Sequence, residues 1–158
     1  MHNHAPDNYK CPLCISISGI ESEDTMMMQD DIFYKDDLVS AAINSKFVGN
    51  NPGHVIIFPN VHYENFYDMP AEVDQQIMKI AKRVAVALKD LRKCEGITLQ
   101  QNNEPDGGQH ALHYHLHIFP RYKDDKLLEN MSNVRISLPS ERLDYANELV
   151  EYFEKNGS

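Results

Sequence analysis

Three histidines at alternate positions are the residues of this chain best placed to do chemistry. His113, His115 and His117 are separated by single aromatic or aliphatic residues. Because successive side chains of a β-strand point to opposite faces, a strand over residues 113–121 would place the three imidazoles on one face. A helix would spread them around its circumference. The segment therefore predicts a concentrated patch of imidazole that could hold a metal, attack a phosphorus atom, or do both.

A second candidate group lies near the N-terminus, where Cys11 and Cys14 form a C-x2-C pair. In a reducing compartment such a pair indicates redox chemistry or zinc binding. A thioredoxin-like redox site would follow a strand within a βαβ unit, and no strand is expected before this pair. Zinc needs two more ligands, for which His62 and His113 are candidates that the fold would have to bring together. The third cysteine, Cys94, is expected to be a small buried residue.

The loop before the triad offers neutral hydrogen-bonding groups. It contains Asn102, Gly108 and Gln109, and its glycines permit close approach of the backbone to a ligand. Such a loop suits a phosphate that is held by dipoles. His54 and His62 flank an earlier apolar strand, so both could converge on the face of the sheet that carries the triad.

Strands mainly follow one another along the chain, and one long helix is inserted among them. A short helix is expected over 11–18, and further strands are expected over 31–34, 38–43, 54–58 and 96–100. This order predicts an α+β fold: an antiparallel sheet of about five strands with one long central helix and a C-terminal helix.

Apolar spacing predicts where the two longer helices lie. The central helix is expected to be capped by Asp68, to carry Pro70 in its first turn, and to face the core with a stripe that reaches Leu91. The C-terminal helix is expected over about 139–155, with this apolar stripe: Leu143, Ala146, Leu149, Val150, Phe153. Residues 123–136 show no clear period and are expected to be a surface excursion.

The length and net charge of the chain limit the kinds of partner that we expect. The chain has 158 residues and a net charge of −9. This length suits a single domain over 1–158. Without a dense basic cluster, polymeric nucleic acid is not an expected partner, whereas a small phosphorylated ligand is compatible with the charge. No apolar run is long enough to span a bilayer and the N-terminus lacks a secretory pattern, so we expect no membrane association and a cytoplasmic location.

The motifs taken together resemble the histidine-triad (HIT) family. His113 to Phe119 fits the family signature His-x-His-x-His followed by two apolar residues. The segments 53–62 and 107–109 look like the Gly-His and Gly-Gln elements of the family, and Cys11 to Cys14 resembles the C-x2-C of its zinc-containing branch. The resemblance covers about residues 11–121 and leaves 122–158 as a C-terminal extension.

The resemblance implies a nucleotide hydrolase or nucleotidyl transferase that works on nucleoside phosphoramidates or dinucleoside polyphosphates. His115 would attack the α-phosphorus and form a nucleotidyl-histidine intermediate. The implied catalytic residues are His115, His117, His54 and Gln109. The implied nucleotide-binding residues are Asn44, Asn102, Gly108, Gln109, His115 and His117. A closed structural zinc site would comprise Cys11, Cys14, His62 and His113. A homodimer is also implied.

Two departures keep other functions open. His110 stands where the family usually has Ser or Thr. Strand alternation would point it away from the face of the triad, although the geometry of the loop could override this. Asn44 lies near the position of a ribose-binding acidic residue. These changes are compatible with a non-catalytic nucleotide-binding or scaffold protein. A catalytic metalloenzyme, with the triad as three ligands around an open position, is a third hypothesis.

Overall fold

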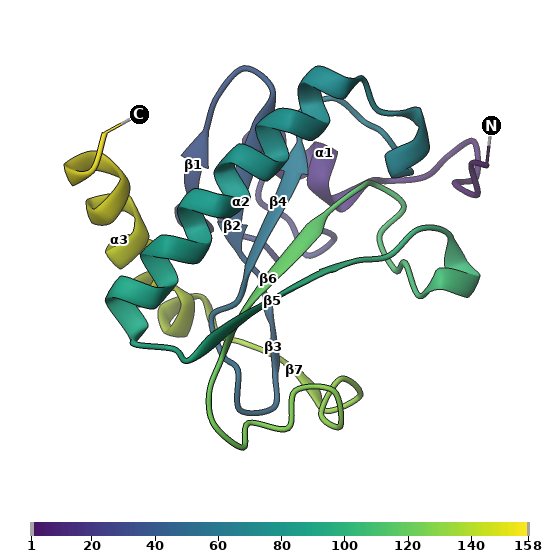
Figure 1. The fold of residues 1–158 in the computed structure, drawn as a ribbon. Coiled ribbons are helices and arrows are strands. Elements are labelled where there is room, and N and C mark those ends of the chain that lie inside the picture. Colours follow the sequence, from purple (N-terminus) through teal and green to yellow (C-terminus); the bar gives the residue numbers. More distant parts are fainter. Residues whose placement is uncertain (1, 158) are drawn as a thin grey trace.

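The computed structural model describes residues 2–157 and has an α+β architecture (Figure 1). Its helices are α1 (Pro12–Ile17), α2 (Ala71–Arg92) and α3 (Pro139–Lys155). Its strands are β1 (Ile32–Lys35), β2 (Val39–Ile43), β3 (Lys46–Val48), β4 (Val55–Pro59), β5 (Gly96–Gln101), β6 (Leu116–Arg121) and β7 (Val134–Ile136). Short 3-10 helices span Gln29–Asp31, Phe66–Asp68 and Pro105–Gly107.

Five strands form the main sheet in the order β1-β2-β4-β6-β5, and every neighbouring pair is antiparallel. The prediction of an antiparallel five-stranded sheet is confirmed. β6 lies between β4 and β5, and His117 pairs with Ile56 on one side and Gln100 on the other. The triad segment therefore enters the sheet in an interior strand, where both neighbouring backbones restrict its position. β3 and β7 form a separate two-stranded sheet.

Helix α2 crosses one face of the main sheet (Figure 1). Ile77, Ile80, Val84 and Leu88 lie on its buried stripe, each no more than 1% exposed. This confirms the predicted helix and most of its core face, but Leu91 is wrong as a core residue because it is 37% exposed. The predicted cap is wrong: Pro70 is the N-cap residue, and no side chain caps the helix. Asp68 instead closes a 3-10 turn, because a residue before proline avoids helical backbone angles and Met69 is extended.

Helix α3 confirms the predicted span of 139–155 and packs against β1 and α2. Ala146, Leu149 and Phe153 are buried as predicted. Leu143 is wrong as a core residue, because it is 40% exposed while its neighbour Arg142 is 1% exposed. The Arg142 guanidinium donates to Asp31 Oδ1 at 2.8 Å and to the Ser137 carbonyl at 2.6 Å, so this buried charge has partners.

Residues 123–136 are more than a surface excursion. Leu127 is fully buried, and Val134–Ile136 form β7, which pairs antiparallel with β3. The absence of a periodic pattern reflects a segment that is fixed by a few individual contacts.

Cys94, at 3% exposed, is buried as predicted. Within residues 2–157, no helix has the length and apolar character needed to cross a membrane.

Candidate functional site

The triad segment keeps the predicted alternation of its side chains, although β6 begins only at Leu116. The predicted strand over 113–121 is therefore too long at its start. Tyr114, Leu116 and Ile118 are buried in the core beneath α2. His115 and His117 are not part of this core and instead line two cavities. His113 is fully buried. Alternation thus extends two residues before the strand pairing itself.

The tautomer of His115 follows from its backbone partner. Nδ1 of His115 lies 2.8 Å from the carbonyl oxygen of His113. A carbonyl can only accept, so Nδ1 carries the proton and donates it to this hydrogen bond. Nε2 is then the nitrogen with a free lone pair. Burial is the main cause that lowers the pKa of His115, which keeps the ring neutral near pH 7 and available as a nucleophile.

Asn44 orders the two neighbouring imidazoles. Its Oδ1 accepts from the backbone N–H of Lys46 at 3.0 Å, which turns the amide nitrogen toward the rings. That nitrogen lies 2.9 Å from Nε2 of His54 and 3.5 Å from Nδ1 of His117. Nδ1 of His117 also lies 3.3 Å from Nε2 of His54. In the tautomer in which the Asn44 amide donates to both ring nitrogens, Nε2 of His117 carries the ring proton and is a neutral hydrogen-bond donor.

His54 is held in place by its contact with Asn44 and by stacking on Phe119. It is 1% exposed and stacks on Phe119 with ring centroids 4.1 Å apart. Burial, followed by the positive charge of Arg92 and the neighbouring His115, lowers the pKa of His54 to about 3. Burial also lowers the pKa of His117 well below its ordinary value. The two rings next to His115 are accordingly neutral at physiological pH.

Four predicted metal ligands come together at the other end of the triad. The ligand atoms of Cys11, Cys14, His62 and His113 all lie within 4.8 Å of one another. Nδ1 of His113 is 3.2 Å from Sγ of Cys11, and Nδ1 of His62 is 3.3 Å from Sγ of Cys14. Two thiols and two imidazoles are the donors of a common structural zinc site.

The hydrogen bonding of His113 also fits a metal. Its Nε2 lies 3.0 Å from the Pro59 carbonyl, which can only accept, so the proton is on Nε2 and the Nδ1 lone pair faces the thiols. Metal-bound imidazoles commonly have such an orienting partner on the second nitrogen. Burial lowers the pKa of His113 to about 3, which also leaves this lone pair available.

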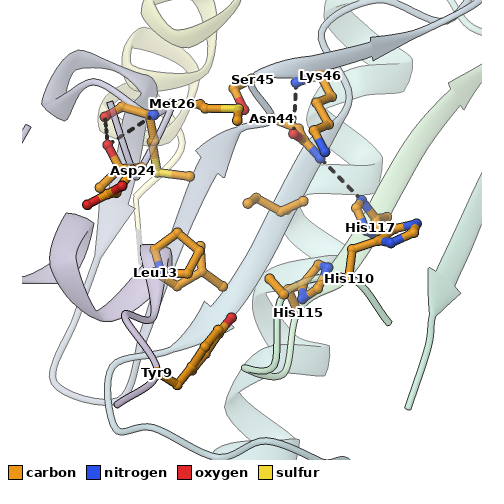
Figure 2. Close-up of a pocket in the computed structure, with 15 residues that line it drawn as sticks. Tyr9, Leu13, Asp24, Met26, Asn44, Ser45, Lys46, His110, His115 and His117 are labelled. Atoms are coloured by element: carbon orange, nitrogen blue, oxygen red, sulfur yellow. Dashed lines mark hydrogen bonds between the residues drawn. The ribbon is translucent and has the colours of Figure 1, made fainter. Parts of the chain in front are cut away.

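Two cavities share the imidazole face. The first, about 270 Å³, is lined on its far side by Leu13, Met26, Met27 and Ile56. Figure 2 shows Leu13 and Met26 across this cavity from His115 and His117. The second, about 370 Å³, extends instead toward Asn102, Gly108 and residues 131–134. Both cavities are lined by Asn44, Lys46, His110, His115 and His117.

His110 lies on the same side as the triad, contrary to the expectation from strand alternation. It lines both cavities together with His115 (Figure 2). Alternation fails at His110 because residues 109–112, which precede the triad, are irregular and do not form a strand. Lys46 is a lining residue that sequence reasoning missed. Its spacing of two residues from Asn44 is the signal that could have indicated it.

The predicted phosphate-binding loop divides into two parts. Asn102 and Gly108 line the second cavity, and Nδ2 of Asn102 donates to the Gly108 carbonyl at 3.1 Å. Gln109 lines neither cavity and is 5% exposed. Its Oε1 accepts from the Glu104 N–H and its Nε2 donates to the Glu64 carbonyl, each at 2.7 Å. Gln109 therefore holds the loop in place through these two hydrogen bonds.

Comparisons with known proteins identify relatives in sequence and in fold. The triphosphatase of Dictyostelium discoideum that is named bis(5'-adenosyl)-triphosphatase is 29% identical over 117 residues, covering 74% of this chain and 76% of that protein. A crystal structure described as a Hit-like protein involved in cell-cycle regulation from Bartonella henselae, with unknown ligand, has a TM-score of 0.77 and 26% identity. It aligns with 95% of this chain and 100% of that one.

A Zn-bound histidine triad family protein from Mycobacterium smegmatis has a similar fold, with a TM-score of 0.73, 20% identity, and coverage of 93% and 95% of the two chains. The sequence model described as the HIT domain matches residues 26–124, which span the sheet, α2 and the triad. The chain therefore belongs to the HIT family.

Proposed function

We propose that this protein cleaves nucleotide conjugates at the α-phosphorus, with His115 as the nucleophile. The observation that carries the proposal is the 2.8 Å hydrogen bond from Nδ1 of His115 to the His113 carbonyl, which leaves an unprotonated Nε2 on a ring that lines both cavities. Hydrolase activity on nucleotides agrees with the relative named bis(5'-adenosyl)-triphosphatase.

The reaction would proceed in two displacements. Nε2 of His115 attacks the α-phosphorus, a P–N bond forms, and the bond to the leaving group breaks with its electron pair. The ring is then a cation with Nδ1–H still bonded to the backbone. Attack by water breaks the P–N bond, releases the nucleoside monophosphate and one proton, and restores neutral imidazole. Transfer to another acceptor in place of water would give a nucleotidyl transferase.

Neutral donors around the nucleophile would bind the phosphate. Nε2–H of His117 can donate to a non-bridging oxygen, and His54 with Asn44 holds that ring in place. Donors that are already oriented stabilise the charge that develops on these oxygens without having to reorganise. We propose this role for Asn44 in place of the ribose contact that the resemblance implied.

The first cavity would bind the nucleoside of the attacked half. Leu13, Met26, Met27 and Ile56 give it an apolar lining, and Tyr9 adds an aromatic ring. A planar base can bury its faces against such side chains, and methionine adapts well to flat aromatic surfaces. We therefore place the base in this cavity and the α-phosphate at the imidazoles.

A structural zinc ion would be held by Cys11, Cys14, His62 and His113. The clustering of the four ligand atoms supports this proposal. Four protein ligands close the coordination sphere, so such an ion would supply structural cross-linking and no reaction step. It would tie α1 to the segment just before the nucleophile, and α1 provides one wall of the first cavity.

We also propose that residues 1–158 form a single domain, with 122–158 as an extension of its core. Phe153 of α3 packs against Phe33 of β1 with ring centroids 5.6 Å apart, which supports one shared core. The homodimer remains a prediction that sedimentation of the purified protein would test.

The experiment is to trap the intermediate. Wild-type protein mixed with diadenosine triphosphate and quenched rapidly should gain the mass of one adenylyl group, which peptide mapping should locate on His115. His115→Ala should lose turnover on the order of 10⁴-fold or more, as expected when a covalent nucleophile is removed. His2→Ala, at an exposed histidine outside both cavities, is the matched control.

Two outcomes would overturn the proposal. Full activity in His115→Ala would exclude this nucleophile. Tight nucleotide binding by the wild type without product, across phosphoramidates and dinucleoside polyphosphates, would instead favour a non-catalytic nucleotide-binding protein.

A further inference from the structure

The segment after the HIT domain match forms a wall of the second cavity. The family match ends at residue 124, whereas Met131, Ser132 and Val134 line the second cavity together with His115 and His117. Figure 1 shows this segment as the long loop between β6 and β7, beyond the end of the sheet. A part of the chain outside the matched domain therefore shapes the active face.

Buried anchors hold this segment in place. The Asp125 carboxylate is 4% exposed and accepts from the Arg121 guanidinium at 2.8 Å, from Nδ2 of Asn51 at 2.7 Å and from the Leu127 N–H at 3.0 Å. Leu127 is fully buried in a cluster with Val48 and Phe119. These contacts fix the start of the segment against the main sheet.

Its far end is fixed as well. The Gly49 N–H donates to the Asn133 carbonyl at 3.0 Å, and Val134 pairs with Val48 in the β3–β7 sheet. Gly49 has a φ of +45°, and a Cβ there would lie 2.6 Å from the Cβ of Asn130, so the close approach needs glycine. The wall is thus built into the fold at both ends.

The second cavity has the chemistry of a site for a large leaving group. Val48, Phe119, Met131 and Val134 give it apolar surface, and Gln100, Asn102 and Ser132 add hydrogen-bonding groups. Its volume of about 370 Å³ exceeds the 270 Å³ of the first cavity. A second nucleoside would occupy such a mixed surface, whereas a small amine would leave most of it empty.

The border between the cavities suits a bridging phosphate chain. Lys46, His110, His115 and His117 line both cavities, so a ligand that extends from one to the other passes all four side chains. The Lys46 ammonium is the formal cation on this path. A point charge on a flexible stem is well suited to phosphates beyond the one that is attacked.

We propose that the second cavity is the subsite for the leaving half of a dinucleoside polyphosphate, and that Met131, Ser132 and Val134 determine this preference. The inference rests on the proposed function. When Nε2 of His115 bonds to the α-phosphorus, the bond to the bridging oxygen breaks and its electron pair leaves with the departing nucleotide. That leaving group is an anionic phosphate and needs no proton at neutral pH. Its nucleoside lies against the wall.

The test compares substrates with large and small leaving groups. Ser132→Trp, at an exposed position, should fill the subsite, and Met131→Ala/Val134→Ala should remove its apolar surface. The double variant should lower kcat/KM for diadenosine triphosphate about tenfold because the substrate loses apolar contacts, and Ser132→Trp should lower it about as much because the indole occupies the space of the leaving nucleoside. For adenosine 5'-phosphoramidate, kcat/KM should stay within about twofold. Leu128→Ala is the matched control, because this residue is in the same segment, 75% exposed, and lines neither cavity.

A binding measurement separates this proposal from the proposed function. In the His115→Ala background, the wall variants should raise Kd for diadenosine triphosphate about tenfold and leave Kd for AMP unchanged. This result is independent of turnover, so failure of catalysis in the wild type would overturn the proposed function alone. Equal losses for both substrates, or an unchanged Kd for diadenosine triphosphate in both wall variants, would overturn the proposed subsite.

Discussion

The buried His54 predicts a stability that falls in mild acid. Its pKa is lowered to about 3 in the folded protein, whereas an exposed histidine in the unfolded chain titrates near 6.5. Between these values the unfolded state binds more protons than the folded state, so the free energy of unfolding rises with pH. This destabilisation is absent above about pH 7, begins as pH falls through 6.5, and grows until the folded-state value near 3.

The magnitude follows from the two pKa values. At about pH 5 the unfolded histidine is protonated and the folded ring remains neutral. Because pH 5 lies about 1.5 units below the unfolded-state pKa, His54 alone lowers the free energy of unfolding by about 2 kcal/mol. His54→Phe removes the titrating group and preserves an aromatic ring against Phe119. Urea unfolding at about pH 7.5 and about pH 5 should show a loss of stability that is smaller in the variant by about 2 kcal/mol.

A difference between the two pH values isolates the titration. A loss of the Asn44 hydrogen bond in His54→Phe lowers stability at both pH values and cancels in the comparison. Ring-proton NMR of the folded wild type provides a second readout, in which the His54 resonance should not titrate down to about pH 5. Equal pH dependence in the two proteins, or a folded His54 that titrates near 6.5, would refute the argument from burial.

Further predictions concern the elements that surround the site. Chelation of zinc, or Cys11→Ser, should lower both the bound metal and the thermal midpoint, as measured by elemental analysis and calorimetry; unchanged stability would exclude a structural ion. Arg142→Met should cost about 3–5 kcal/mol in urea unfolding, because it leaves Asp31 buried without its partner, and the added Asp31→Leu change should recover most of that loss. Gln109→Ala should cost about 1–3 kcal/mol, because two backbone groups lose their partners, and should lower kcat/KM by displacing the loop. A stable variant with normal kinetics would contradict this bracing role.

The parts of the fold that the sequence predicts are those encoded by local repetition. Alternating residues around His115 predicted one imidazole face, and the stripe of α2 predicted its buried side. The C-x2-C pair indicated two metal ligands by spacing alone. Its partners His62 and His113 are 48 and 99 residues from Cys14, and only the fold brings them together.

Interactions between distant residues account for the errors. Leu143 fits the helical period better than Arg142, yet Arg142 is buried because Asp31, 111 residues away, neutralises it. Strand alternation predicts the wrong side for His110, because side chains alternate between faces only in extended backbone and β6 does not reach residue 110. The wall at Met131 has no periodic signal, since Asp125 positions that segment through single hydrogen bonds.

To bind the anionic substrate that we propose, this acidic protein must attract it by means other than net charge. The chain carries a net charge of −9, and burial keeps His54 and His117 neutral. Lys46 is the Lys or Arg residue that lines both cavities. Oriented N–H dipoles in a partly buried site interact with phosphate more strongly than the same groups would in water, because water screens them less. Neutral imidazoles would also leave the proposed nucleophile, His115, unprotonated, so one feature, burial, would serve both phosphate binding and the first step of the proposed reaction.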